Sequence, residues 1–149
     1  NHDYVLVTGN STKETIAQKG QSVTNLFSDI ISLGFTDNFL IFNSCYSEQS
    51  FSSPFNSEVL MKSNENIVIL TSSSKDQKSY ILRDNPLSIF METLLEGLSF
   101  CLEGTSKFSI FELIRYVTNN VNQRANRIGV NQNPRFIIQN MRHLFYLFD

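Results

Sequence analysis

Short apolar runs alternate along this chain with longer segments in which apolar residues recur every three or four positions. Four of the runs are rich in β-branched and aromatic residues, as is typical of β-strands. They cover residues 4–7, 39–43, 67–71 and 143–148. The runs at 39–43 and 67–71 are almost continuously apolar. We therefore predict that these two are central strands of a parallel sheet that is covered on both faces.

Two segments have helical spacing with clear signals at one or both ends. The first is expected to begin after Ser22, a good N-cap, and to stop at Gly34. Its apolar stripe comprises Val23, Leu26, Phe27, Ile30 and Ile31. The second is expected to open at Asn85 and Pro86, because proline is favoured at the first helical position. Its shared face comprises Phe90, Leu94, Leu95 and Leu98.

A third helix is predicted from the capping box Ser109 to Glu112. Its apolar stripe comprises Leu113, Ile114, Val117 and Val121. Because strands and helices alternate, the sequence favours one α/β domain over residues 1–149, with helices on both faces of the sheet. In open α/β sheets, chemistry gathers where the strands end at their carboxyl edge. Cys45 and the polar segment 71–79 both follow such ends.

The composition excludes several function classes. The 12 basic and 14 acidic residues are scattered, so no surface for nucleic acid or for a membrane is visible. No motif for metal, nucleotide or dinucleotide binding is present, and we expect no cofactor. No apolar run reaches the roughly 18 residues of a membrane span, and the first ten residues lack the basic-then-apolar pattern that is typical of a signal peptide. The chain opens on a strand-like run without an initiator Met, which we interpret as a piece of a longer polypeptide.

The two cysteines, Cys45 and Cys101, lie in unlike local sequence, which argues against a disulfide and favours a reducing, cytoplasmic compartment. Cys45 has two interpretations. It is either a small residue packed in the core, where free cysteines are common, or a nucleophile. A nucleophilic thiol needs a nearby base or positive charge. Of the two histidines, we interpret His143 as a strand residue, which leaves His2 as the candidate base.

Five segments, taken in chain order, resemble caspase-like cysteine peptidases and in particular their metacaspase branch. The segment FLIFNSCYS is similar to the strand and nucleophile segment of that branch, which carries Asp-Ser-Cys-His-Ser-Gly. The other four are IVILTSSSKDQKSY, NPLSIFMETLLEGL, KFSIFELIRYVTNNV and NQNPRF, similar to the next strand with its substrate loop, two helices and a Gln-x-Pro turn. The resemblance is collinear over about residues 39–136. In caspase relatives the histidine lies about 50 residues before the cysteine, and here the separation is 43.

This resemblance implies a three-layer α/β/α sandwich with a mainly parallel central sheet, whose first strands are missing from this chain. It implies a cysteine endopeptidase without a cofactor, in which Cys45 attacks the peptide carbonyl and His2 protonates the leaving amine. The backbone N–H groups of Cys45 and Asp3 would form the oxyanion hole. A protein or peptide substrate would bind by strand addition. The implied substrate-binding residues are Asn43, Ser73, Asp76, Gln77 and Ser79.

Some residues depart from the family pattern. Asn1 and Asp3 flank His2 where the family has glycines, and Glu48 replaces the glycine after the nucleophile. Asn43 is neutral where metacaspases carry an acid that binds a basic substrate side chain. Two hypotheses therefore stand beside each other. The first is a peptidase regulated by a partner protein or an upstream domain. In its latent form, the peptidase would show no activity until that partner binds. The second is a catalytically inert scaffold or interaction module in which Cys45 does no chemistry.

Overall fold

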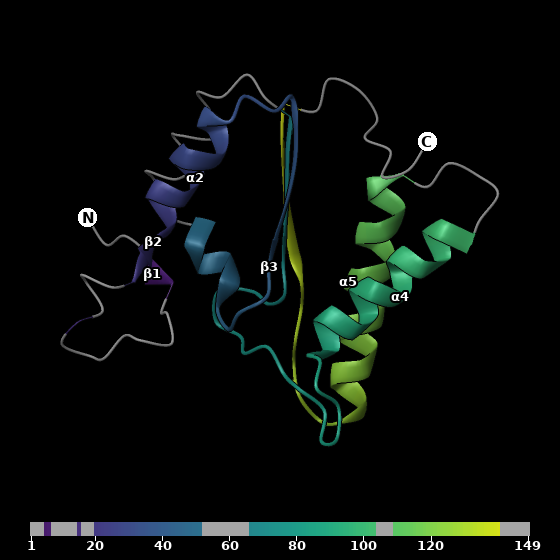
Figure 1. Cartoon of the computed structure of the whole chain (residues 1–149). Helices are drawn as coiled ribbons and strands as arrows, with labels where there is room; N and C mark the ends of the chain where they lie inside the picture. The colour runs from purple at the N-terminus through teal and green to yellow at the C-terminus, as the bar shows by residue number, and fades with distance from the viewer. Residues whose placement is uncertain (1–4, 7–14, 16–19, 52–65, 104–108, 141–149) are drawn as a thin grey trace.

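The computed structural model describes residues 5–6, 15, 20–51, 66–103 and 109–140 (Figure 1). Over these ranges the protein is a small α/β fold, with a two-stranded ribbon β1-β2 and a mixed three-stranded sheet in the order β3-β4-β5. The elements are β1 (Val5–Leu6), β2 (Gln21–Ser22), α2 (Val23–Ser32), β3 (Asp37–Phe42), η1 (Ser47–Phe51), β4 (Asn66–Thr71), α4 (Ile89–Glu103), α5 (Ile110–Arg127) and β5 (Arg135–Gln139).

The three-stranded sheet confirms the two apolar strands and corrects the expectation of a mainly parallel sheet. β3 and β4 are parallel, with Phe42 opposite Thr71 at their carboxyl ends. β5 then pairs antiparallel with β4, which places Arg135 opposite Thr71. The sheet is mixed because residues 135–139, which are not among the four predicted strands, form its third strand. The run predicted at 143–148 lies outside the described residues.

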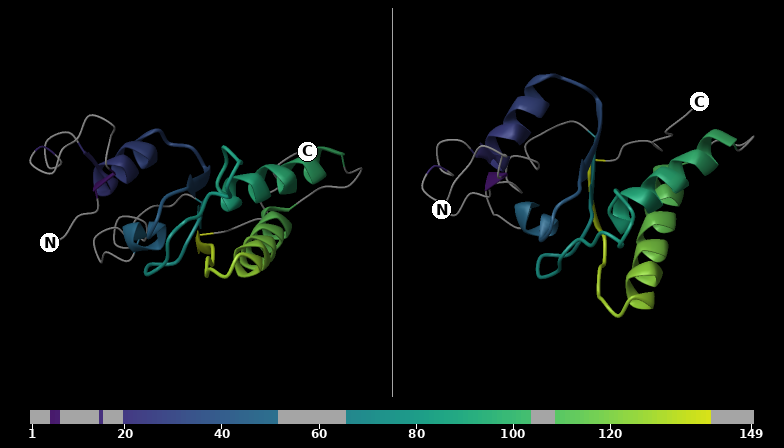
Figure 2. Two further views of the ribbon diagram at one scale, coloured as in Figure 1. Left: turned by 90° about the horizontal axis from the view of Figure 1, so that it is seen from below. Right: turned by 60° about the horizontal axis from the view of Figure 1, so that its bottom comes forward.

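Helices cover both faces of the sheet, as predicted. Successive residues of β4 point to opposite faces, so Ile67 and Ile69 pack with Val23 and Phe27 of α2. On the other face, Val68 and Leu70 belong to a core completed by α4 and α5. All six residues of β4 are buried, which explains its unbroken apolar sequence. The sheet stands between α2 and the α4–α5 pair in all three views (Figures 1 and 2).

The ends of α2 and α5 confirm the capping signals. The Ser22 hydroxyl accepts a hydrogen bond from the N–H of Asn25 at 3.1 Å. At the start of α5, the Ser109 hydroxyl accepts from the Glu112 N–H at 3.4 Å, and the Glu112 carboxylate accepts from the Ser109 N–H at 2.9 Å. Gly34 follows α2 with φ of 70°, the left-handed conformation that glycine adopts without strain.

Helix α4 begins at Ile89, three residues later than the sequence predicted. Asn85 and Pro86 lie in the turn that precedes the helix and not in its first turn. The side chain of Ser88 is the actual cap, since its hydroxyl accepts from the N–H of Met91 at 3.1 Å. The side-chain oxygen of Asn85 instead accepts from the N–H of Leu87 at 2.9 Å, before the helix begins.

Close packing joins α4 to α5. A methyl group on Gly97 would lie 2.8 Å from Cδ1 of Leu113, so any larger residue here would force the side chains between the two helices to shift. Leu95, which had been predicted on the buried face, is 47% exposed and points away from the core. Across the same interface, Arg124 binds Glu96 with an N–O distance of 2.6 Å. The helix pair therefore combines an apolar contact with an ion pair at its edge.

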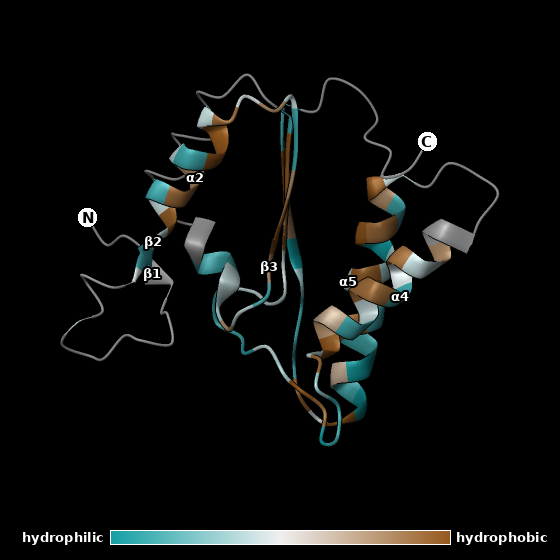
Figure 3. Cartoon of the chain, viewed as in Figure 1, coloured by the Kyte–Doolittle hydropathy of each residue, from teal (hydrophilic) through white to brown (hydrophobic). Residues whose placement is uncertain are grey.

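The distribution of apolar residues follows this arrangement. The strands of the sheet are largely hydrophobic, whereas the C-terminal half of α5 is mostly hydrophilic (Figure 3). Among the described residues, no helix is both long enough and apolar enough to cross a membrane.

Candidate active site

Cys45 lies three positions after the last residue of β3, at the carboxyl end of a strand that is parallel to its neighbour. Its side chain is exposed. Its Sγ lies 3.8 Å from the carbonyl oxygen of Ser79, a contact in which the thiol is the donor. The next residue, Tyr46, has φ of 57°, a left-handed conformation that costs free energy in residues other than glycine. The position agrees with the predicted strand end, and the exposure argues against a cysteine packed in the core.

A cluster of buried serines joins the loop of Cys45 to the loop that follows β4. The hydroxyls of Ser72 and Ser73 both donate to the carbonyl of Ser44, at 2.9 and 3.3 Å. The hydroxyl of Ser47 accepts from the N–H of Ser73 at 3.2 Å. These loops meet because the parallel register ends both strands at the same level, where the Ser72 N–H donates to the Phe42 carbonyl at 2.8 Å. The residues on both sides of Cys45 are therefore firmly held.

Two of the predicted substrate-binding side chains, those of Ser73 and Gln77, form hydrogen bonds to other residues of the protein. Ser73 is completely buried, and its hydroxyl bonds to Ser44, so it braces the loop and does not line an open groove. A role of Ser73 in substrate binding stays a prediction. The side-chain oxygen of Gln77 accepts from the backbone N–H of Asn133 at 2.8 Å, and its carbonyl accepts from the N–H of Tyr46 at 2.9 Å. Gln77 thus also ties loops together.

The other three predicted substrate-binding residues lie nearer to solvent. Asp76 is exposed, and Ser79 is half-buried with its carbonyl against the thiol. Asn43 is exposed, and its side-chain oxygen accepts from the hydroxyl of Ser88 at 3.0 Å. Asn43 therefore connects the end of β3 to the cap of α4. The role of these three residues in substrate binding stays a prediction.

The proposed partners of Cys45 from the start of the chain lie outside the described residues. These are His2, the candidate base, and Asp3, the candidate second donor to the oxyanion. His143 lies outside them as well, so the described ranges contain no histidine. Cys101, the second cysteine of the sequence, belongs to the last turns of α4.

Glu48, three positions after Cys45, connects this loop to the loop after β4 and to the start of β5. A carboxylate oxygen of Glu48 accepts from the N–H of Lys75 at 2.9 Å and lies 3.9 Å from Nε of Arg135. Within the described ranges, no three His, Cys, Asp or Glu side chains are grouped so that they could hold a metal ion.

Sequence reasoning missed Gln132, whose side chain reaches the same loops from the far end of the chain. Gln132 is completely buried. Its amide nitrogen donates to the carbonyl of Ser72 at 2.9 Å and to the hydroxyl of Ser79 at 3.3 Å. Its oxygen accepts from the N–H of Tyr80 at 3.0 Å. The signal in the sequence is the segment Gln132 to Pro134, which is similar to the Gln-x-Pro turn of caspase-like peptidases, and that similarity does not reveal that the glutamine side chain is buried.

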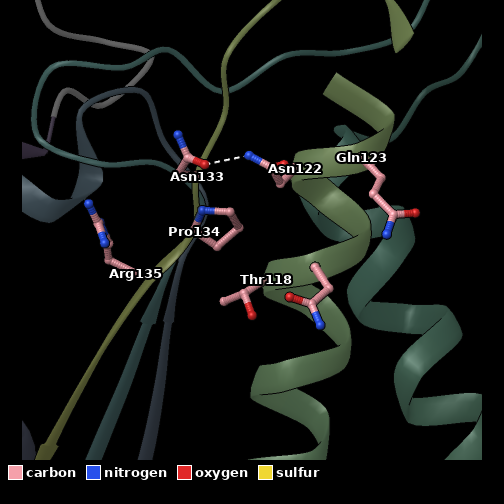
Figure 4. A pocket seen from close by; sticks show the side chains of 7 residues that line it. Thr118, Asn122, Gln123, Asn133, Pro134 and Arg135 are labelled. Atoms are coloured by element: carbon pink, nitrogen blue, oxygen red, sulfur yellow. Dashed lines mark hydrogen bonds between the residues drawn. The ribbon is translucent and has the colours of Figure 1, made fainter. Parts of the chain in front are cut away.

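Two hollows lie next to these loops. A polar hollow of about 490 Å³ lies between α5 and the start of β5, where Asn122 bonds to Asn133 (Figure 4). It is lined by Thr118, Asn119, Asn122, Gln123, Asn133, Pro134 and Arg135. A more apolar hollow of about 400 Å³ lies between α2 and β3 and ends at Asn43 and Ser44, directly before Cys45. Its apolar lining consists of Leu26, Ile30, Leu40, Ile41 and Phe42.

The fold and this site define a small α/β domain with an exposed cysteine at the carboxyl end of a parallel strand. Comparison with models of known protein families gives no match, and comparison with curated protein sequences gives none either.

Proposed function

We propose that this protein is a cysteine endopeptidase in which Cys45 is the nucleophile and His2 the acid–base. The observation that carries the proposal is the exposed Cys45 thiol at the carboxyl end of β3, in a loop that is braced on both sides. A nucleophile must be accessible to substrate and still be held in one geometry. The resemblance of residues 39–136 to caspase-like peptidases supports the same assignment.

The backbone around Cys45 offers a further argument. The N–H of Tyr46 donates to the Gln77 carbonyl, whereas the N–H of Cys45 donates to no group in the described part of the chain. An unoccupied N–H beside the nucleophile is what an oxyanion hole requires. In the proposed reaction, the thiol gives its proton to His2, and sulfur bonds to the substrate carbonyl carbon. The Cys45 N–H and that of Asp3 stabilise the oxyanion, and His2 then protonates the leaving amine.

Water completes the cycle by hydrolysing the acyl–sulfur bond, with His2 accepting its proton. The proposed substrate is an extended protein or peptide segment, and no cofactor takes part. We propose that the exposed residues Asp76 and Asn43 contact such a segment. We further propose that a regulatory protein or another part of the same polypeptide controls this activity, and that it acts in a reducing compartment such as the cytoplasm.

The test compares Cys45→Ala with Cys101→Ala, which removes the other cysteine of the chain. Cleavage of an unfolded protein and of a peptide library is measured together with circular dichroism, which checks that each variant folds. We expect Cys45→Ala to lose about 10³-fold or more of the cleavage rate, since the covalent step has no replacement. Cys101→Ala should retain the wild-type rate. Equal cleavage by Cys45→Ala and wild type would refute the proposal.

An inert scaffold is the second candidate, and one contact favours it. The Cys45 thiol donates to the Ser79 carbonyl, so its proton is held by a group that is not a base. If the scaffold hypothesis is right, no substrate in the library is cleaved, and iodoacetamide modifies Cys45 no faster than a cysteine in an unstructured peptide. A chain that becomes active only after a partner is added would support the latent form of the peptidase.

A further inference from the structure

The buried carboxamide of Gln132 lies at the junction of three backbone segments. It binds the end of β4 through the Ser72 carbonyl and binds the following loop through the Ser79 hydroxyl and the Tyr80 N–H. Gln132 and Ser72 have no exposed surface, so no water can replace a hydrogen-bond partner lost between them. One side chain from the segment between α5 and β5 therefore joins both ends of the loop 72–80.

The loop held by Gln132 is the one that contacts the thiol. The Ser79 carbonyl lies 3.8 Å from Sγ of Cys45, and the hydroxyl of the same serine is a partner of Gln132. The neighbouring Asn133 adds a second tie, because its N–H donates to the Gln77 side chain while the Gln77 carbonyl holds Tyr46. Asn133 is in turn fixed from α5 by Asn122 (Figure 4).

We propose that Gln132 is a positioning residue for Cys45, acting through the Ser79 carbonyl that it holds against the thiol. The inference rests on the proposed nucleophilic role of Cys45. Gln132 touches neither the sulfur nor a bound substrate. It fixes the position of Ser79, whose carbonyl accepts from the thiol, and it aligns the loop that carries Asp76.

The experiment measures the rate at which iodoacetamide alkylates Cys45, followed by mass spectrometry in a Cys101→Ser background. Gln132→Met keeps the length of the side chain and removes all three hydrogen bonds. We expect its alkylation rate near neutral pH to rise by about two- to fivefold, the range expected when a weak S–H donor loses its acceptor. Its cleavage rate should fall, because the thiol is no longer held in one orientation.

Thr93→Val is the matched control for a general loss of stability. Thr93 is also completely buried, but its hydroxyl donates to the Ile89 carbonyl within α4, away from the loops of the site. Both variants are compared well below their melting temperatures. The control should leave the alkylation rate of Cys45 within about twofold of wild type, since a surface thiol is unaffected by a bond lost elsewhere. An equal rise in both variants would overturn the proposal.

Gln132→Glu separates positioning from stability, because its effect on the alkylation rate of Cys45 should depend on pH. Burial raises the pKa of a carboxyl at this position, so the group is protonated in mild acid and can still donate to Ser72 and accept from Tyr80. Near pH 5.5 the alkylation rate relative to wild type should then be close to unity. At about pH 8.5 it should approach that of Gln132→Met, because an ionised carboxylate cannot donate.

Each variant is compared with wild type at the same pH, and the charged and polar groups on the loop, Lys75, Asp76 and Tyr80, are the same in all the proteins. An unchanged rate in Gln132→Met, or a ratio for Gln132→Glu that is the same at both pH values, refutes the positioning role. These outcomes are separate from failure of the peptidase proposal, which is decided by cleavage in Cys45→Ala.

Discussion

At the ends of β3 and β4, single hydroxyl groups replace backbone partners that the sheet no longer provides. Ser47 is 1% exposed, and its hydroxyl accepts from the Ser73 N–H while also lying 3.2 Å from the Ser73 carbonyl. The sequence suggested an open groove lined by serine and other polar side chains. It could not show that Ser73 is buried, because a serine has the same local sequence signature whether its hydroxyl faces solvent or protein.

Replacing Ser47 by alanine should lower the free energy of unfolding by about 1–3 kcal/mol, since the buried Ser73 N–H loses its acceptor. Urea denaturation of the variant measures this loss. Ser28→Ala is the control, because that hydroxyl donates to the Thr24 carbonyl on the exposed surface of α2. It should change stability by less than about 0.5 kcal/mol. Equal losses in the two variants would contradict a buried role for Ser47.

At the scale of the element, α5 follows from signals in its own sequence. The start of α4 and the pairing of β5 with β4 do not follow from local signals. The capping box and the stripe Leu113, Ile114, Val117 and Val121 are local signals, and all four stripe residues are buried. Glu112 accepts hydrogen bonds from the N–H and the hydroxyl of Ser109, and these bonds lower the pKa of its carboxyl below 4.5. The ionised form is therefore the one that stabilises the helix.

Because the pKa of Glu112 is lower in the folded than in the unfolded chain, its contribution is fully present above pH 4.5 and is lost as pH falls through the folded value. We expect Glu112→Gln to be less stable than wild type at neutral pH. The difference in unfolding free energy should shrink in acid, where the wild-type carboxyl is also neutral. Urea denaturation over a series of pH values measures it. A difference that is constant with pH would show that the carboxylate charge does not contribute.

At the scale of the whole molecule, β4 connects two cores that otherwise belong to different helices. Ile69 is buried against α2, and the next residue, Leu70, is buried against α4 and α5. Both side chains have no exposed surface. A strand that supplies side chains to both cores makes the stability of one core depend on the other.

We expect Ile69→Ala and Leu70→Ala each to reduce the free energy of unfolding by about 2–5 kcal/mol, as large-to-small changes in a packed core do. In each variant, circular dichroism and tyrosine fluorescence should follow the same transition, because the two faces unfold together. Ile41→Ala is the control on β3, where the side chain is 39% exposed, and it should cost less. A variant in which the two probes separate would show that the faces unfold independently.

The sequence by itself determined the elements whose signals are local: β3 and β4 from their apolar runs, α2 and α5 from their caps and stripes, and the place of Cys45 after β3. Capping bonds and side-chain periodicity act between residues a few positions apart, so they can be recognised without the fold. The tertiary structure alone decided that β5 pairs antiparallel with β4, that Ser73 is buried, and that Gln132 reaches the loop beside Cys45. Each of these depends on a partner more than 20 positions away, and only the folded chain selects that partner by satisfying buried polar groups and covering both faces of the sheet.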